Sequence, residues 1–369
     1  MTVTRYIMVG GFLGAGKTTA MLRFGQHLAD KGLRVGLITN DQSSGLVDTT
    51  MLSTSGFPVE EITGGCFCCR FTSLTDAAER LTARTTPDVF LAEPVGSCTD
   101  LKATVSYPLR RMHGDSYSVA PFSVLVDPAR ALRVLGVETG RRFTDKVQYV
   151  YLKQLEEADA LIINKVDAIE PSRVAALRTA LASRFPRAAI FEVSARTGAG
   201  LEAWFDHVAA ADDRNTANLE IDYDEYADGE ARLGWLNCTA HVSGPAFDGD
   251  RWLLSLVTAI QARLRARDVE IAHLKATLSP DDEGTFLSVV NAVSSDAAPV
   301  QPFSIEGAIG AGEVIINLRA EGDPEVLDEE TSAALAAAAG HAGLQVAVQH
   351  AEHFRPGRPV PTHRVVFNR

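Results

Sequence analysis

The stretch that decides the fold reads Gly10-Gly11-Phe12-Leu13-Gly14-Ala15-Gly16-Lys17-Thr18, and its last eight residues match the pattern G-x-x-x-x-G-K-T. An apolar run precedes this stretch and a helical pattern follows it, which is the setting of a phosphate-binding loop. In such a loop, glycines let backbone N–H groups turn toward a phosphate, and the start of the helix adds partial positive charge. We expect Lys17 on the β- and γ-phosphates and the Thr18 hydroxyl on Mg²⁺. The predicted nucleotide contacts are Gly11, Gly14, Ala15, Gly16, Lys17, Thr18 and Thr19.

Around this loop, residues 1–211 alternate short apolar runs with amphipathic helical stretches. The expected strands are Arg5–Val9, Val35–Thr39, Val89–Ala92, Ser123–Val126, Ala160–Ile163 and Ala189–Val193. The expected helices are Thr18–Lys31, Thr75–Arg84, Lys146–Glu157, Arg173–Arg184 and Leu201–Ala211. This alternation predicts an α/β domain of the P-loop type, with a mostly parallel sheet and helices on both faces.

The rhythm changes after residue 211. An acidic, weakly periodic stretch, 212–232, is expected to be a linker. In residues 233–369 the expected strands are Trp235–Val242, Glu270–Leu278, Phe286–Ala292, Glu313–Arg319 and Leu344–Gln349. The expected helices are Arg251–Arg267 and Glu325–Gly340, and the apolar stripe Trp252–Leu264 is expected to be core. This order predicts a smaller α+β domain, whose antiparallel sheet is covered on one face by two helices.

A second nucleotide motif, Asn164-Lys165-Val166-Asp167, follows a predicted strand. Ligands of open α/β sheets bind at the carboxyl ends of the strands, which is where this N-K-x-D lies. A carboxylate such as Asp167 accepts hydrogen bonds from N1–H and the N2 amino group of guanine, and adenine offers no matching pair. Ser194 and Ala195 follow the next strand, where their backbone can meet the guanine O6. The nucleotide is therefore expected to be GTP.

Two acidic residues, Asp41 and Glu93, each end a predicted strand. We expect both carboxylates at the sheet edge that faces the nucleotide, where either can hold Mg²⁺ or orient the attacking water. With Lys17 they are the predicted catalytic residues, and the alternative for each is a capping or surface carboxylate. Gly96 fits a hinge or a γ-phosphate sensor, and Asp127 fits a helix N-cap equally well.

Three of the five cysteines lie together in Gly65-Cys66-Phe67-Cys68-Cys69. C-x-C-C places three soft ligands on one loop; thiolates suit Zn²⁺, and Co²⁺ and Ni²⁺ accept the same ligands. Three ligands leave a fourth position open, which suits a site that gives its metal away, whereas structural zinc sites close at four. Buried core cysteines and a redox pair are the alternatives. Cys98 and Cys238 are isolated and predicted to be core residues, although Cys98 follows soon after Glu93.

The composition of the 369-residue chain is that of a globular protein, with 46% hydrophobic and 22% charged residues. No apolar run reaches the roughly 18–20 residues of a membrane helix, and the N-terminus lacks the features of a signal peptide. A formal net charge of −12 argues against nucleic acid or an anionic membrane as the main partner. We therefore expect a cytoplasmic protein with no nucleic-acid or membrane partner.

Together these motifs resemble those of the CobW-type GTPases, which are metal-chaperone relatives of the UreG and HypB nickel-insertion GTPases. The match covers residues 5–210, and its hallmarks are G-G-F-L-G-A-G-K-T-T at Gly10–Thr19 and G-C-F-C-C at Gly65–Cys69. Glu93-Pro94-Val95-Gly96 is similar to the family's E-x-x-G element. By this resemblance, Cys66, Cys68 and Cys69 are metal ligands. The chain departs from the family by reading Asn40-Asp41-Gln42-Ser43 in place of N-E-F-G and by lacking a histidine-rich tract.

The resemblance implies a GTP-hydrolysing chaperone that binds a divalent metal, zinc before cobalt, and delivers it to a client metalloprotein. Because the C-x-C-C loop lies between Asp41 and Glu93 in the chain, GTP is expected to order the thiolates and hydrolysis to release the ion. One alternative is a GTPase that activates a cobalamin-dependent or other metalloenzyme and holds a purely structural metal. A small-molecule kinase is another, and N-K-x-D argues against it. The sequence leaves a homodimer open.

His350, His353 and His363 are expected to be surface histidines, because a strand would send the rings of the first two to opposite faces.

Overall fold

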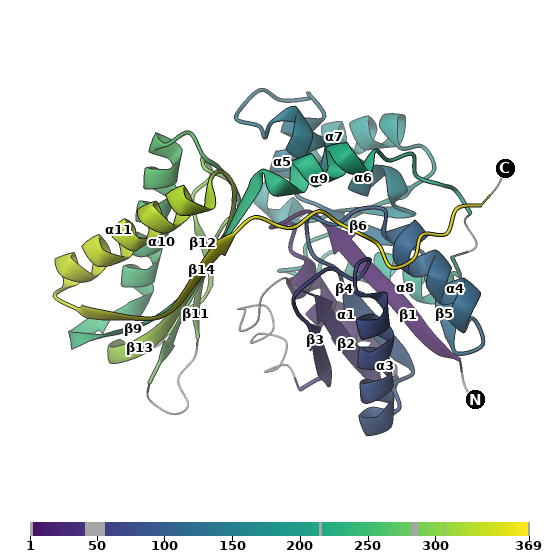
Figure 1. The fold of residues 1–369 in the computed structure, drawn as a ribbon, viewed down its shortest axis with the longest axis horizontal. Helices are drawn as coiled ribbons and strands as arrows, with labels where there is room; N and C mark the ends of the chain where they lie inside the picture. Colours follow the sequence, from purple (N-terminus) through teal and green to yellow (C-terminus); the bar gives the residue numbers. More distant parts are fainter. Residues whose placement is uncertain (1–2, 41–55, 214–215, 282–286, 306, 368–369) are drawn as a thin grey trace. The chain divides into compact units, whose positions relative to one another are not determined.

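The computed structural model describes residues 3–40, 56–213, 216–281, 287–305 and 307–367, and the chain divides into two compact units (Figure 1). Unit 1 comprises residues 1–227 together with 358–369, and unit 2 comprises residues 228–357. Asp41, one of the two predicted switch carboxylates, lies outside the described residues.

Unit 1 is built on an eight-stranded parallel sheet in the order β3-β2-β4-β1-β6-β7-β8, with β5 beside β1. The strands are β1 (Thr4–Gly11), β2 (Val35–Asn40), β3 (Val59–Ile62), β4 (Val89–Glu93), β5 (Tyr117–Val119), β6 (Ser123–Val126), β7 (Ala160–Ile163) and β8 (Ala189–Glu192). The helical segments are α1 (Lys17–Asp30), α3 (Phe71–Thr85), η1 (Lys102–Ser106), α4 (Tyr107–His113), α5 (Pro128–Val134), α6 (Asp145–Glu157), η2 (Val166–Ala168), α7 (Pro171–Arg184), α8 (Leu201–Ala210) and α9 (Tyr223–Ala231). The predicted parallel α/β domain is confirmed.

Both faces of this sheet are covered. Successive residues of β1 point to opposite faces, and all of them from Tyr6 to Gly11 are buried. On one face, Phe24 of α1 stacks on Phe205 of α8, with ring centroids 4.1 Å apart. Trp204 beside it donates its indole N–H to Ser123 Oγ at 2.9 Å, so this buried polar group is satisfied. The result is a rigid sheet whose carboxyl edge carries the sequence motifs.

Unit 2 is a six-stranded antiparallel sheet in the order β12-β11-β10-β13-β9-β14. Its elements are β9 (Leu233–Asp248), α10 (Gly249–Ala266), β10 (Glu270–Pro280), β11 (Ser288–Ala292), β12 (Val300–Phe303), β13 (Ala308–Glu321), α11 (Pro324–Ala342) and β14 (Gln345–Phe354). The predicted stripe from Trp252 to Leu264 lies in the core with residues of the sheet and of α11. Figure 1 shows α10 and α11 together on one side of the sheet, as predicted.

The structure differs from the predicted domain boundaries in two places. The predicted linker, 212–232, contains the helix α9, because the Asp222 carboxylate accepts hydrogen bonds from the backbone N–H groups of Asp224 and Glu225 in its first turn. The predicted C-terminal domain ends at residue 357, because residues 358–367, here called the tail, belong to unit 1.

Among the contacts that hold the tail on unit 1, two involve its last residues. Arg364 forms a 2.7 Å ion pair with the buried Asp100, and the Val365 N–H donates to the Ala103 carbonyl at 2.8 Å. A buried carboxylate needs such a partner, since an unpaired charge is costly to bury. The return of the tail is therefore fixed by specific polar contacts within unit 1.

The three predicted surface histidines lie on two segments. His350 and His353 lie on β14 and both are exposed, whereas the His363 ring of the tail packs edge-on against Phe71 with centroids 5.2 Å apart. Among the described residues, none of the three belongs to a cluster of metal-ligating side chains. No helix in the described ranges combines the length and the hydropathy that a membrane span requires.

Candidate nucleotide and metal site

The phosphate-binding loop connects β1 to α1, and its backbone requires glycine. Gly16, immediately before α1, has a φ of +92°, and a Cβ on it would lie 2.5 Å from the side-chain nitrogen of Asn164. Lys17 and Thr18 begin the helix, and both side chains are buried. The loop therefore presents the start of a helix, where a phosphate is favoured.

Glu93 ends β4, the strand next to β1, and contacts the first helical turn of α1. The Thr18 hydroxyl lies 3.3 and 3.2 Å from the two Glu93 carboxylate oxygens, and Lys17 Nζ lies 3.8 Å from the nearer one. A hydroxyl and a carboxylate are hard oxygen ligands of the kind that Mg²⁺ prefers, so the pair fits that ion. Gly96 lies against the same loop, since a Cβ there would be 3.0 Å from Lys17 Nζ.

The N-K-x-D residues brace the phosphate-binding loop. The Asn164 side chain donates to the Ala15 carbonyl and accepts from the Ala195 N–H, both at 2.9 Å. Lys165 Nζ donates to the Gly14 carbonyl at 2.7 Å. Through these contacts, the loop after β1 is tied to the loops after β7 and β8.

Lys165 also pairs with Asp127 at 2.9 Å, and Asp127 caps α5 by accepting the Arg130 N–H at 3.0 Å. The N-cap prediction for Asp127 is therefore confirmed. Burial opposes ionisation of Asp127, but the charges of Lys165 and Arg130 outweigh it and hold the pKa of this carboxyl below its usual value.

The surroundings of Asp167, the predicted base-reading carboxylate, favour its ionised form. Its burial favours the neutral form, but a hydrogen bond to Ser194 and an ion pair with Arg196 outweigh it, so the pKa of Asp167 lies below its usual value. Ser194 and Ala195 are buried, whereas Arg196 is exposed. The partner of the Asp167 carboxylate is thus an exposed side chain.

The cysteine loop is held at this sheet edge by Asn40, the last residue of β2. The Asn40 side chain donates to the carbonyls of Ile62 and Gly65, at 3.0 and 2.7 Å, and accepts from the Phe67 N–H at 2.8 Å. These hydrogen bonds flank Cys66 on both sides. Asn40 was not among the predicted site residues, although it lies at the end of a predicted strand.

The three sulfurs of the C-x-C-C motif converge. Sγ of Cys66 lies 2.7 Å from that of Cys68 and 3.2 Å from that of Cys69, and the remaining pair is 3.7 Å apart. All three are free thiols; Cys66 and Cys68 are buried and Cys69 is half-buried. In the part of the chain that the structure describes, no other group of three or more His, Cys, Asp or Glu side chains converges in this way. A soft ligand set of this kind fits Zn²⁺.

The three thiols of the cluster differ in their pKa values. Hydrogen bonds from Cys68, Cys69 and Cys98 hold the pKa of Cys66 well below its usual value, and the contact with Cys66 raises the pKa of Cys69 to about 11. The same contacts raise the pKa of Cys68 well above its usual value. Metal binding at this cluster must therefore displace protons.

Two neighbours of the cluster were not expected from the sequence. Cys98 is buried, as predicted, but its thiol interacts with Cys66 and Cys68. The tail also lies against the loop: the Val360 N–H donates to Cys69 Sγ at 3.2 Å, and Thr362 donates to the Cys68 and Cys69 carbonyls, each at 2.9 Å. The nearness of Cys98 to Glu93 in the chain was a weak signal, and the tail gave none.

The model of the "CobW/HypB/UreG, nucleotide-binding domain" family matches residues 5–192, just over half of the chain. The chain belongs to this family. Curated relatives include a zinc chaperone CobW from a Sinorhizobium species, 29% identical over 201 residues, with 49% of this chain and 56% of that protein covered. The zinc chaperone YeiR of Escherichia coli K12 is 27% identical over 177 residues, with 48% and 51% covered. The chain spans about half the length of these relatives.

Solved structures similar to this one include HypB from Helicobacter pylori in complex with nickel, with 20% identity and a TM-score of 0.42, covering 57% of this chain and 86% of that one. A Zn(II)-bound YjiA GTPase from E. coli has 17% identity and a TM-score of 0.37, covering 91% of this chain and 99% of that one.

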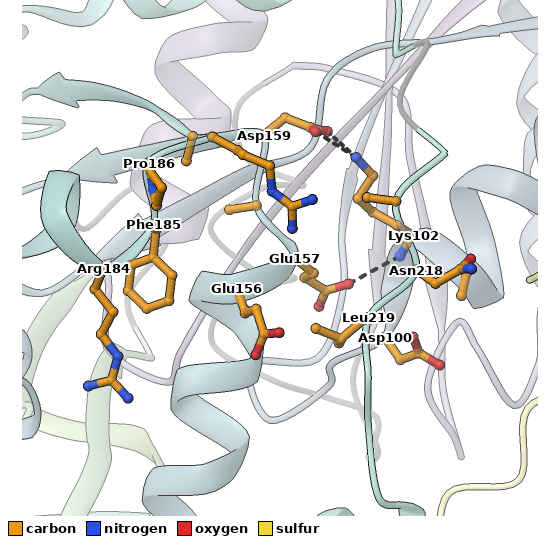
Figure 2. A pocket seen from close by; sticks show the side chains of 15 residues that line it. Asp100, Lys102, Glu156, Glu157, Asp159, Arg184, Phe185, Pro186, Asn218 and Leu219 are labelled. Carbon is orange, nitrogen blue, oxygen red and sulfur yellow. Dashed lines mark hydrogen bonds and ion pairs between the residues drawn. The ribbon is translucent and has the colours of Figure 1, made fainter. Parts of the chain in front are cut away.

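A separate cavity of about 320 Å³ adjoins Asp159, at the start of β7, whereas the N-K-x-D motif follows the end of that strand. Figure 2 shows Lys102 paired with Asp159, at 2.6 Å, and donating its backbone N–H to Glu157 at 3.2 Å. None of the predicted site residues lines this cavity. Burial, together with the nearby charge of Asp100, raises the pKa of Glu157 to about 8.

Replacing Asn40 with Ala should release the cysteine loop. The substitution removes three hydrogen bonds. If it destabilises the closed loop by only about 1.4 kcal/mol relative to an open form, the cluster thiols should react roughly tenfold faster with a disulfide reagent. The rates are measured on reduced, metal-free protein, with Asn237→Ala, a buried asparagine of unit 2, as the matched control. Equal rates in Asn40→Ala and wild type would show that this side chain does not hold the loop.

The raised pKa of Glu157 predicts that the free energy of unfolding depends on pH. Its pKa rises from about 4.3 in the unfolded chain to about 8 in the fold, so the folded state binds the extra proton and its stability falls as pH rises toward 8. Between pH 5 and 8, wild type should lose on the order of 3 kcal/mol of unfolding free energy by this route. Glu157→Gln should flatten the slope in urea titrations, while Glu156→Gln, its exposed neighbour, should leave it unchanged. Parallel slopes in all three proteins would contradict the assignment.

Proposed function

We propose that this protein is a GTP-hydrolysing metal chaperone, which binds a divalent transition metal at Cys66, Cys68 and Cys69 and delivers it to a client metalloprotein under nucleotide control. The observation that carries the proposal is the shared sheet edge. Asn40 fastens the cysteine loop to β2, and β2 pairs with β4, whose last residue, Glu93, contacts the start of α1. The proposed metal ligands and the phosphate-binding loop thus lie at the same sheet edge. Only β4 separates β2, which holds the cysteine loop, from β1, which precedes the phosphate-binding loop.

The nucleotide half of the proposal rests on the two braced loops. The glycine-rich loop would receive the phosphates, with Lys17 as their cationic contact. Thr18 and Glu93 would hold Mg²⁺, which supplies positive charge to the phosphates when bound, and Asp41 remains a sequence-based candidate for the same role. Asp167, whose pKa is lowered by its hydrogen bond to Ser194 and its ion pair with the exposed Arg196, would select guanine, with Ala195 beside it.

The metal half rests on sulfur chemistry. Three converging thiols favour Zn²⁺, and accept Co²⁺ or Ni²⁺. Cys69 is half-buried, so the cluster has a side from which a client could take the ion. Two curated relatives named zinc chaperones support zinc as the cargo, and only about half of their length is matched.

A second candidate is a GTPase module that activates a metalloenzyme and keeps a structural metal. One observation favours it: the Cys98 thiol adjoins the cluster, and a fourth sulfur would close the site. The two candidates differ in whether the bound metal ion exchanges, because a structural ion stays bound through the nucleotide cycle and a cargo ion does not.

The nucleotide assignment predicts that GTP is hydrolysed in preference to ATP. Lys17→Ala should lower the hydrolysis rate by about 100-fold or more, because the phosphates lose their cationic contact. Lys31→Ala, an exposed lysine just after α1, is the control and should hydrolyse GTP at the wild-type rate. Phosphate release measured with each nucleotide tests this, and preferential use of ATP would support the small-molecule kinase alternative instead.

The metal assignment predicts one tightly bound Zn²⁺ per chain. In competition with a chromophoric chelator, Cys66→Ala should lose this binding, because the low-pKa thiolate is removed. Cys238→Ala, a buried cysteine of unit 2, should retain it. Tight zinc binding that persists in Cys66→Ala would place the metal elsewhere.

A further inference from the structure

The tail crosses the cysteine loop at the half-buried sulfur of the cluster. Val360 donates its backbone N–H to Cys69 Sγ at 3.2 Å. Thr362 donates its backbone N–H to the Cys68 carbonyl and its hydroxyl to the Cys69 carbonyl, each at 2.9 Å. Cys66 and Cys68 are buried, whereas Cys69 is half-buried. The tail therefore contacts the side of the cluster from which a metal ion would enter or leave.

The sequence of this part of the tail leaves a single backbone donor in place. In Pro359-Val360-Pro361 the prolines carry no N–H, so that of Val360 is the only one in the three residues. Each proline fixes its own φ and disfavours a helical conformation of the residue before it. Residues 358–361 accordingly form neither a helix nor a strand. This restricted backbone directs its one N–H at Cys69 Sγ.

The position of Val360 is set by the backbone of the tail. Its side chain is 69% exposed, so burial of apolar surface does not explain why the residue lies here. Further along the tail, the Asn218 side chain donates to the Phe367 carbonyl at 2.6 Å and accepts from the Phe367 N–H at 3.0 Å. Together with the Arg364–Asp100 ion pair, these contacts fix the tail independently of the cysteine loop. Little further ordering is then needed to place the Val360 N–H at the sulfur.

We propose that the Val360 N–H is a positioning group for the metal ligand Cys69, and that the tail thereby sets how tightly the three-cysteine site holds its ion. The inference deepens the proposed function and rests on its metal-binding half. A hydrogen bond to a metal-bound thiolate orients the sulfur and disperses its negative charge, and losing such an outer contact typically costs about 10–100-fold in metal affinity. Displacement of the tail would therefore loosen the half-buried ligand first.

The other anchor of the cysteine loop acts at a different cysteine. Asn40 fixes the residues on both sides of Cys66. The tail fixes the far end of the motif, at Cys69. Loss of the Val360 contact should therefore free Cys69 while Cys66 stays in place, so that metal binding is weakened rather than abolished.

The test uses Co²⁺ as a probe on the reduced full-length chain. In Val360→Pro a ring carbon replaces the N–H, so the Kd for Co²⁺ should rise about 10–100-fold, with faster transfer of the ion to a chelator. Val360→Ala keeps the N–H and should restore tight binding, which separates the backbone donor from the side chain. The matched control is Val366→Pro, in the same tail. Val366 is 48% exposed, and its N–H donates no hydrogen bond within the described part of the chain.

A second measurement observes the hydrogen bond in the unsubstituted protein. In wild type loaded with ¹¹³Cd²⁺ and labelled with ¹⁵N-valine, the Val360 amide proton should show scalar coupling to cadmium through the Cys69 sulfur. Its exchange with solvent should be slower than that of the Val366 amide. The two signals are identified by their absence from the spectra of Val360→Pro and Val366→Pro. A Val360 amide that shows no coupling and exchanges as fast as that of Val366 would overturn the proposal.

The outcomes separate this inference from the proposed function. A wild-type Kd in Val360→Pro, with binding lost in Cys66→Ala, would overturn the positioning role and leave the three-cysteine site standing. Wild-type Co²⁺ binding in Cys66→Ala would remove the proposed metal site, and this inference with it. Equal weakening in Val360→Pro and Val366→Pro would assign the effect to a general loosening of the tail and would also overturn the role of Val360. Should Val360→Pro fail to fold by circular dichroism, the cadmium coupling in wild type decides, with the signal identified from Val360→Ala.

Discussion

The side-chain amide of Asn40 is the interaction on which the candidate site depends. Three hydrogen bonds from this one residue fix the cysteine loop to the carboxyl end of β2. The C-x-C-C segment lies between β3 and α3, and Asn40 and the tail hold it from two sides. Because β2 pairs with β4, the same fixed point stands next to the strand that ends at Glu93. The proposed metal ligands and the proposed phosphate contacts therefore lie at one edge of the parallel sheet.

Much of the fold could be predicted because it follows from local sequence patterns, namely a glycine-rich motif and the periodicity of apolar residues. The glycine-rich loop predicted the start of the parallel sheet domain. The stripe Trp252–Leu264 predicted a core helix of unit 2, and the burial of α10 residues with those of the sheet and α11 confirms it. The short strands β5 and β12, of 3 and 4 residues, were not predicted, because a run of three or four residues is too short to show a hydrophobic periodicity. Cys98 and the tail could not be placed, since their partners are distant in sequence and only tertiary packing brings them together.

The protonation of the three thiols affects how the proposed site would bind a metal. Because Cys66 is stabilised as a thiolate by neighbouring thiols, the metal-free loop is held together by hydrogen bonds rather than forced apart by like charges. An arriving ion replaces protons, so binding weakens as pH falls.

The most direct measurement is the affinity for Zn²⁺ of the full-length chain loaded with a non-hydrolysable GTP analogue, compared with the chain loaded with GDP. Coupling through the shared sheet edge predicts a difference of about tenfold or more, roughly 1.4 kcal/mol, and an equal effect of Zn²⁺ on the ratio of the two nucleotide affinities. Equal zinc affinities in the two nucleotide states would contradict nucleotide control of the metal.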